Sequence, residues 1–417
     1  MSFSRAYALR FSVCYWLLCL QPFPFGTIPG TDGVALADLR AREVMIQFVG
    51  RRLFGLTITD GQYSGADTVS NYVAMFCFVV LATVLAAAWA LLRRRSLERE
   101  QPRVTALHQV GLRYVLGTSI LGYAVVKLWK VQFPSLEPSD LELNYGESSP
   151  MGLLWRFMGH STAYAFATGL AELAGGVLLF FRRTTLLGAL LLVGVLTQVL
   201  LLNLCFDVNV KIWSAHLLLM AVILAAGQLR PLVGFFLRGT AASQAPAPLV
   251  FPDPPCWLRR ATIAAKAVIL AAFSLQLVSN VRDQYRQFGD GHAPLPLQGS
   301  YRVEQAEYGD SCPEALPFQK VTIDRQGFIT FSGDGKRAGW KIAYDEAAGS
   351  LALEEYSGGG KLASDPAMPI GPRAEVLELR GTIGEKATRV VLRKVESRDA
   401  LLNKRGFHWV NDEAFYR

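Results

Sequence analysis

The sequence predicts a mainly α-helical, multi-pass membrane protein that ends in an antiparallel β domain. Of the 417 residues, 51% are hydrophobic and only 18% are charged, a balance typical of proteins with several membrane spans. The long apolar runs lie in residues 1–280, whereas residues 297–417 have the mixed composition of a soluble domain. One chain is therefore expected to fold in two solvents, lipid and water.

About seven apolar runs of roughly 20 residues are long enough to cross a bilayer as helices. They cover residues 7–25, 71–92, 108–128, 162–181, 184–206, 210–228 and 261–280. Basic clusters such as Arg93–Arg95, Arg182–Arg183 and Arg259–Arg260 mark the cytoplasmic ends of these runs. The N-terminus is then inside and the C-terminal domain outside. The net charge of +8 has the same origin, so no nucleic-acid partner is predicted.

Two segments near the N-terminus need a separate interpretation. The run 7–25 has a basic start but no clean small-residue cleavage site, which favours a retained span over a cleaved signal peptide. Residues 36–58 mix arginines with apolar residues at helical intervals, a pattern typical of a helix lying in the membrane interface. Its arginines are predicted to lie on the outer side of the membrane, contrary to the positive-inside rule. They are tolerated there because an interfacial helix can extend arginine side chains to the lipid headgroups.

The predicted organisation has five parts. They are an N-terminal membrane segment (1–107), a four-helix bundle (108–238), a cytoplasmic Pro/Ala-rich linker (239–257), a seventh transmembrane helix (258–282) and an extracytoplasmic β domain (297–417). The connection 129–161 lies outside the membrane, and a short lid helix within it is compatible with its sequence.

The most informative residue is Glu172, in the middle of the apolar run GLAELAGGVLLFFRR. A charge at bilayer depth costs roughly 2.5–3.5 kcal/mol on insertion scales, so such residues usually face a bundle interior. Gly175 and Gly176 follow one turn later, and small residues let helices approach closely. The Glu172 face of this helix is therefore predicted to be the packed one.

Four more polar residues are predicted to converge with Glu172 toward the outer leaflet. They are Lys127, Gln198, Asn203 and His216. The functional interpretation is an outward-opening polar cavity that binds a small polar or quinone-like headgroup or relays a proton. The alternative is a set of interhelical hydrogen bonds, each worth about 1 kcal/mol, that fixes the register of the helices. For Lys127, as for Asp207 and Lys211, snorkelling at a span end is a further explanation.

Several kinds of chemistry have no signature in the sequence. The six cysteines include no C-x-x-C and no His/Cys metal spacing, so neither a disulfide framework, a dithiol centre nor a metal site is predicted. Haem ligated by His160 and His216 is disfavoured, because both rings would have to face one plane between helices. Nucleophile elbows, P-loops and dinucleotide fingerprints are not found. No catalytic residue is therefore predicted.

At these residues the chain resembles the DoxX-like membrane family. The similarity covers about residues 108–238, with RYVLGTSILGYAVVKLW resembling the first family helix and AELAGGVLLFFRRTTLLGALLL the second. Arg113, Lys127 and the Glu172-x-x-Gly175-Gly176 element carry it. The resemblance implies a four-helix bundle in the bacterial cytoplasmic membrane, in a family whose named members are subunits associated with quinone-linked sulfur oxidation or membrane redox complexes. The closing LLNKRGFHWVNDEAFYR resembles the end of long DoxX-like proteins.

The sequence of the C-terminal domain predicts a meander of short β-strands. The β-type stretches are SYRVEQA, FQKVTID, GFITFSG, GWKIAYD, SLALEEY, AEVLELR and TRVVLRK, separated by Gly- and Asp-containing turns. In the last of them Thr388, Val390 and Leu392 share one face, and Arg389 and Arg393 the other. Such strands can close into a small calycin-like barrel, either filled by side chains or holding an apolar ligand. The segment RGFHWVNDEAFYR is expected to cap it.

Three functions follow from these observations. The leading one is a redox- or quinone-associated membrane subunit whose outer β domain binds a membrane redox partner or a ligand. The second is a membrane-anchored β-barrel that binds lipids or other apolar small molecules. The third is a scaffold without chemistry, in which the polar residues only hold helices together.

Overall fold

The chain divides into two compact units in the computed structural model. We call residues 1–126 and 167–277 the helical unit, and residues 127–166 and 278–417 the β unit. The structure describes residues 3–20, 31–58, 66–94, 96–227, 229–239, 255–308, 318–333, 336–345, 350–355, 376–383, 386–395 and 402. Most of the predicted linker 239–257 and of the closing segment 401–417 lies outside the described residues.

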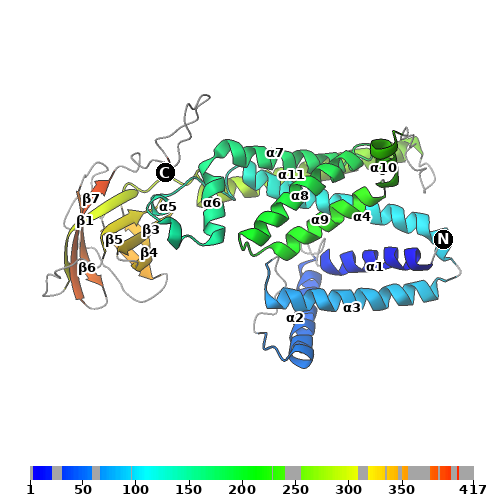
Figure 1. The fold of residues 1–417 in the computed structure, drawn as a ribbon, viewed down its shortest axis with the longest axis horizontal. Helices are drawn as coiled ribbons and strands as arrows, with labels where there is room; N and C mark the ends of the chain where they lie inside the picture. The colour runs from blue at the N-terminus through cyan, green and yellow to red at the C-terminus, as the bar shows by residue number, and fades with distance from the viewer. Residues whose placement is uncertain are drawn as a thin grey trace. The chain divides into compact units, whose positions relative to one another are not determined.

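Each of the seven predicted spans forms a helix (Figure 1). These helices are α1 (Phe3–Leu20), α3 (Val69–Leu92), α4 (Leu97–Leu128), α7 (Thr162–Leu179), α8 (Thr185–Cys205), α9 (Lys211–Ala226) and α11 (Cys256–Phe288). Two further helices, α2 (Asp32–Phe54) and α10 (Leu229–Arg238), lie outside the predicted spans. Within the described residues, four of these (α3, α7, α8 and α11) are long and apolar enough to cross a membrane, and α9 is apolar but shorter. The mainly helical membrane class is confirmed, and seven spans stay a prediction.

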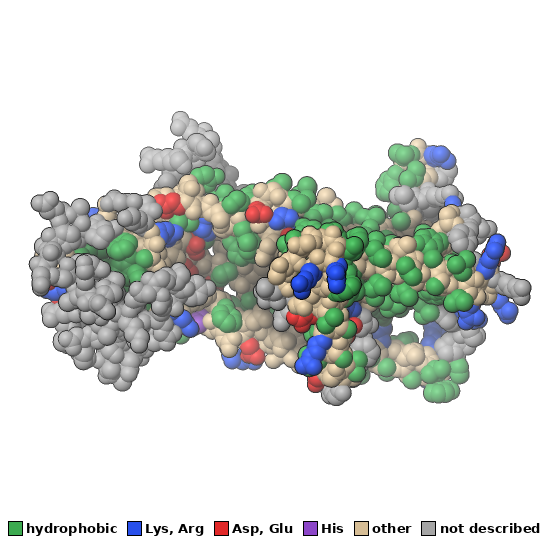
Figure 2. Space-filling view, turned by 90° about the horizontal axis from the view of Figure 1, so that it is seen from below, with side chains coloured by type: hydrophobic (Ala, Val, Ile, Leu, Met, Phe, Trp, Pro, Cys, Tyr) green, Lys and Arg blue, Asp and Glu red, His purple; other side chains and the backbone are tan. Residues whose placement is uncertain are grey.

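Large hydrophobic side chains cover the outside of the membrane-length helices. Val84 on α3 is 60% exposed, Leu187 on α8 60% and Val268 on α11 66%. Figure 2 shows hydrophobic side chains over much of the helical unit, with Lys and Arg gathered toward its ends. Apolar patches of this extent need an apolar solvent, which fits contact with a lipid bilayer.

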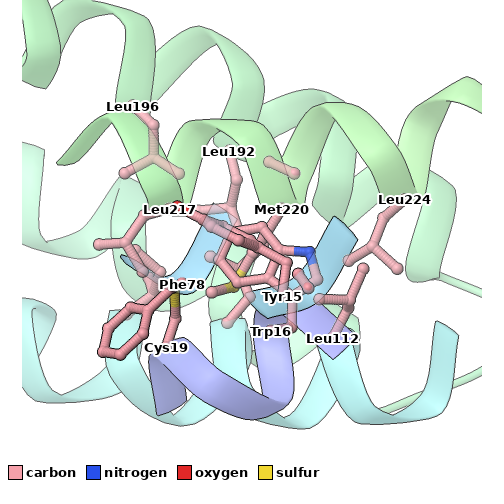
Figure 3. Close-up of a cluster of buried hydrophobic side chains, with 14 of the residues drawn as sticks. Tyr15, Trp16, Cys19, Phe78, Leu112, Leu192, Leu196, Leu217, Met220 and Leu224 are labelled. Carbon is pink, nitrogen blue, oxygen red and sulfur yellow. The ribbon is translucent and has the colours of Figure 1, made fainter. Parts of the chain in front are cut away.

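The core of the helical unit joins α1, α3, α4, α8 and α9. Tyr15, Trp16 and Cys19 from α1 lie against Phe78 of α3 and Leu192 of α8 in one buried cluster (Figure 3). The first helix is therefore an integrated part of this unit. That packing is what a retained span requires.

Glycines bring α7 into close contact with its neighbours. A Cβ on Gly188 of α8 would lie 2.9 Å from the carbonyl oxygen of Gly175. A Cβ on Gly176 would lie 3.4 Å from the carbonyl oxygen of Gly117 on α4. The helix face that carries Glu172 is therefore packed, as the small-residue pattern predicts.

Two cations hold the C-terminal end of α7. The Arg113 Nε of α4 donates a hydrogen bond to the Leu179 carbonyl oxygen at 2.9 Å, and the Lys266 ammonium of α11 donates to the Phe180 carbonyl oxygen. The last carbonyl groups of a helix have no partner inside the helix and carry partial negative charge. Both basic residues therefore stabilise the end of the helix that bears Glu172.

The β unit contains the seven predicted strands. They are β1 (Gly299–Tyr308), β2 (Lys320–Ile323), β3 (Phe328–Gly333), β4 (Lys336–Asp345), β5 (Ser350–Glu355), β6 (Val376–Ile383) and β7 (Lys386–Val395). They form one antiparallel sheet in the order β5-β4-β3-β2-β1-β7-β6. The first and last strands pair, for example Val303 with Leu392, so the meander returns to its beginning. Among the described residues β5 and β6 are the sheet edges, and closure into a barrel stays a prediction.

One face of the sheet is the core of the β unit. Val390 and Leu392 of β7 are buried, whereas Arg393 is exposed, which confirms the predicted alternation. Phe331 of β3 and Trp340 of β4 pack edge to face with ring centroids 5.4 Å apart in the same cluster. Aromatic and branched side chains from the strands fill this face.

The connection between α4 and α7 belongs to the β unit. It contains the short helix α5 (Pro138–Leu141), the 3₁₀ turn η1 (Tyr145–Glu147) and α6 (Pro150–His160). Ser149 caps α6 by accepting the Gly152 N–H at 3.0 Å, and Pro150 occupies the first helical position. The short helix compatible with this sequence is present.

Replacing Gly188 with alanine tests the close contact of α7 and α8. The new Cβ would meet the Gly175 oxygen and the Leu178 Cβ, each at 2.9 Å, so the helices must separate. We expect Gly188→Ala to destabilise the protein by about 1–3 kcal/mol, measured as a lower thermal unfolding midpoint in detergent. Gly194→Ala on the same helix meets nothing within 4 Å and should leave the midpoint unchanged or raise it. Equal midpoints for the two variants would contradict the contact.

Candidate functional site

Glu172 is buried in the helical unit, within electrostatic range of an aromatic side chain of another helix. It lies on α7 and is 2% exposed. Tyr123 of α4 lies within electrostatic range of the Glu172 carboxylate and is hydrogen-bonded by the Trp213 side chain of α9. The indole of tryptophan can only donate, so the phenol oxygen accepts that bond and its own O–H remains available as a donor.

This arrangement combines three hydrogen-bonding groups of different chemistry. A carboxylate accepts hydrogen bonds when ionised and donates one when protonated, a phenol does both, and an indole donates. Gly175 and Gly176 lie one turn further along α7, where Leu192 of α8 and Ile120 of α4 pack against them. The group can bind a small headgroup that carries oxygen atoms, or it can hold and pass a proton.

The other four predicted residues occupy different surroundings. Asn203 is 7% exposed on α8, and Gln198 of the same helix is exposed. The His216 Nε2 lies 2.7 Å from the Tyr15 hydroxyl, and its Nδ1 lies 2.7 Å from the Ile212 carbonyl oxygen. The Nε2 contact therefore links α9 to α1, and the Nδ1 contact with the backbone of α9 itself fixes the ring, which is a role in helix packing.

Lys127 is 7% exposed at the end of α4 and belongs to the β unit. Lys211 forms an ion pair with Asp207, with 2.9 Å between Nζ and Oδ1. Asp67 accepts the Lys211 and Ile212 N–H groups, each at 2.8 Å, and so caps α9. Lys211 and Asp207 thus form an ion pair at the start of α9, and snorkelling of these residues stays a prediction. The outward-opening cavity as a whole stays a prediction.

Metal binding has no visible basis in the described residues. They contain no group of three or more His, Cys, Asp or Glu side chains able to hold an ion.

The sequence did not indicate a second polar cluster, which lies in the β unit. We call it the loop clamp. Its members come from the loop before α5 and α5 itself, from the segment after α11, and from the turn between β2 and β3. In that order they are Ser135, Glu137 and Ser139, then Asp290 and Gln298, then Asp324 and Arg325.

Two serines of the loop each bind one carboxylate with both backbone and side chain. The Ser135 N–H and hydroxyl donate to Asp290 at 2.9 and 2.7 Å. The Ser139 N–H and hydroxyl donate to Asp324 at 3.0 and 2.6 Å. Such pairs of bonds fix both the position and the rotation of the loop.

Glu137 lies between these two serines and meets the turn directly. Its Oε2 accepts the Arg325 N–H at 3.1 Å and the Gln298 Nε2–H at 2.9 Å. The Arg325 Nη1 in turn donates to the Asp290 carbonyl oxygen at 2.7 Å. The β2–β3 turn can present these groups because Gly327 adopts φ +78°, a left-handed conformation that favours glycine.

The two clamp aspartates have opposite protonation preferences. Burial acts to raise the pKa of Asp290, but the Ser135 hydrogen bonds and the charges of Lys130 and Arg325 outweigh it, so the pKa is lowered. Burial, helped by the charges of Glu137 and Asp140 and opposed by the Ser139 bonds, raises the pKa of Asp324 to about 6. Asp324 therefore changes its protonation between pH 5 and pH 7.

No protein-family model matches the chain, and no solved structure matches it. The chain is similar to a protein of Bacillus subtilis (strain 168) described as uncharacterized protein YwoB, with 30% identity over 124 residues. The matched residues make up 30% of this chain and 79% of the Bacillus protein.

The loop clamp is expected to weaken between pH 5 and pH 7. The folded pKa of Asp324, about 6, lies above the ordinary 3.8, so the docked loop binds a proton more tightly than the undocked loop. Docking is then strongest below pH 4, loses stability as pH rises to about 6, and is constant above that. Hydrogen exchange of a peptide covering Ser139, corrected for intrinsic rates, should show less protection at pH 7 than at pH 5.

Asp324→Asn provides the control for this pH dependence. Its side-chain oxygen can accept the Ser139 N–H and its amide can donate to the Ser139 hydroxyl, so both bonds remain without a charge. Protection in this variant should be independent of pH over the same range. Identical protection of the unmodified protein at the two pH values would contradict the role of Asp324.

Proposed function

We propose that this chain, which belongs to the same family as the Bacillus subtilis protein YwoB, is a multi-pass membrane subunit. In this proposal it binds a quinone-like headgroup at Glu172. The observation that carries this proposal is the burial of Glu172, at 2% exposure, beside Tyr123 in a membrane-length helix. Because the Bacillus relative has no described activity, the proposal rests on the site itself.

Energetics support a task for Glu172 beyond packing. Keeping a carboxylate at bilayer depth costs roughly 2.5–3.5 kcal/mol, and a glutamine or leucine would fill the position more cheaply. The two carbonyl oxygens of a quinone need hydrogen-bond donors, which protonated Glu172 and the Tyr123 hydroxyl supply. A carboxyl group at the same place can accept or return the proton that quinone reduction consumes.

The topology we propose has seven spans with the N-terminus inside and the β unit outside a bacterial cytoplasmic membrane. The arginine clusters at Arg93–Arg95, Arg182–Arg183 and Arg259–Arg260 support this orientation. The resemblance to DoxX-like proteins supports the four-helix core and an association with a membrane redox partner. The β unit would then meet that partner at the outer surface.

Ligand binding inside the β unit, as a calycin-like barrel, is less well supported. Its inner face is occupied by its own side chains, such as Ile329, Phe331 and Leu392, each at most 2% exposed. A carrier of lipids needs an open apolar volume at that place. Tight burial there favours the helical unit as the ligand-binding part.

Glu172→Leu tests the proposed headgroup site, because leucine removes the hydrogen-bond donor that glutamine would keep. The purified protein in nanodiscs should bind a ubiquinone or menaquinone analogue, and the variant should bind it about two- to tenfold more weakly, because a hydrogen bond between neutral groups contributes about 0.5–1.5 kcal/mol. Equilibrium binding would be followed by quenching of tryptophan fluorescence. Glu147→Leu, an exposed glutamate on η1, is the matched control and should bind like the unmodified protein.

The outcomes separate the remaining functions. If the unmodified protein binds no quinone analogue, the proposal fails. If Glu172→Leu changes the unfolding midpoint while binding per folded molecule is unchanged, Glu172 serves helix packing and the scaffold function is favoured.

A further inference from the structure

We propose that α2 is a binding surface for the headgroups of anionic phospholipids. This inference does not depend on the proposed function of Glu172, because it concerns another helix and another ligand.

The helix α2 runs across α3 near the N-terminal end of α3 (Figure 1). The two helices pack through a buried stripe on α2 that includes Arg42 and Ile46. The Arg42 guanidinium is paired with Asp38 and lies 4.9 Å from the ring centroid of Phe78 on α3. Since α3 is long and apolar enough to cross a bilayer, a helix that crosses it near one end lies along the membrane surface.

The side of α2 that faces away from α3 is exposed and carries apolar residues among its arginines. Val34, Val44 and Phe48 recur at helical spacing and are 53%, 66% and 63% exposed. A helix that has apolar residues on the side away from its packing partner needs a second apolar environment. For a helix along the membrane surface, that environment is the acyl-chain region beneath the headgroups.

Charge determines which lipids fit this surface. Arg40, Arg51 and Arg52 are exposed on α2, whereas Arg42 is already engaged in the contact with α3. Figure 2 shows basic side chains next to hydrophobic ones at the tip of the helical unit nearest the viewer, where α2 projects. Guanidinium groups bind phosphate in a bidentate manner, and a basic residue near an anionic leaflet contributes about 1 kcal/mol of attraction.

The position of the arginines strengthens the choice of anionic lipid. Arg51 and Arg52 lie in the last turn of α2, which ends at the C-cap Gly55 with φ +66°. A cationic pair at the C-terminal end of a helix is favourable by itself, but it stays exposed here beside Leu53 and Phe54, which are also exposed. In a membrane, lipid phosphate groups would bind Arg51 and Arg52, and the acyl chains beneath the headgroups would contact Leu53 and Phe54.

Photo-cross-linking from α2 tests this assignment. Phe48→benzoylphenylalanine would be reconstituted in vesicles with equal amounts of phosphatidylcholine and phosphatidylglycerol, and the cross-linked lipids identified by mass spectrometry. We expect phosphatidylglycerol to be enriched about fivefold or more over phosphatidylcholine. Adding Arg51→Gln and Arg52→Gln should reduce the enrichment nearly to the ratio in the vesicle, whereas Arg51→Lys and Arg52→Lys should keep most of it.

Arg259→Gln with Arg260→Gln is the matched control, because this exposed pair at the start of α11 carries the same charge. It should leave the enrichment at Phe48 unchanged. The proposal is overturned if the cross-linked lipids match the bulk ratio, if the control lowers enrichment as much as the α2 variant does, or if the main product is a second copy of the chain.

Discussion

Close packing of α7 through glycine is the constraint on which the helical unit depends. Gly175 lies against the Leu192 side chain of α8, where a Cβ would be only 2.6 Å from Leu192 Cδ2, and a Cβ on Gly188 of α8 would lie 2.9 Å from the Gly175 carbonyl oxygen. This contact makes Glu172 a buried residue instead of a lipid-exposed one. Arg113 and Lys266 then fix the end of the same helix by binding its last carbonyl groups. Packing, burial of the carboxylate and capping of the helix are therefore consequences of one arrangement.

Aromatic rings accommodate cations throughout the helical unit. Arg10 is fully buried, lies 5.1 Å from the ring centroid of Trp89 and donates to the Gln101 side chain at 3.1 Å. Lys266 lies 5.4 Å from the ring centroid of Tyr114. Placing a cation over an aromatic face offsets part of the loss of hydration. Arg10 also forms an ion pair with Glu100, with 3.8 Å between Nη2 and Oε2, so the aromatic ring supplements an acidic partner at this buried position.

Local patterns predict the helices and strands of this protein, and they do not predict most of its polar contacts. The hydrophobic period is a property of each segment, so α7 and β7 are evident from a few residues. His216 illustrates the limit, because its bond to Tyr15 joins residues 201 positions apart. Gln198 and Asn203 share α8, yet only Asn203 is buried, since packing against neighbouring helices decides which side faces inward. The loop clamp joins Ser139 to Asp324 over 185 positions, and no local signal marks either residue.

The loop clamp is connected through the chain to the helical unit. Residues 127–166 join α4 to α7, and they pack with the β strands as one unit. The helix α4 carries Tyr123, and α7 carries Glu172, so the clamped loop is the direct covalent connection between the two helices that form the candidate site. A change at Asp324 that loosens the loop removes a restraint on the ends of both helices. The β unit is therefore joined by the chain itself to the helices that carry Tyr123 and Glu172, so binding or a change of pH at the β unit can act on the candidate site through the loop.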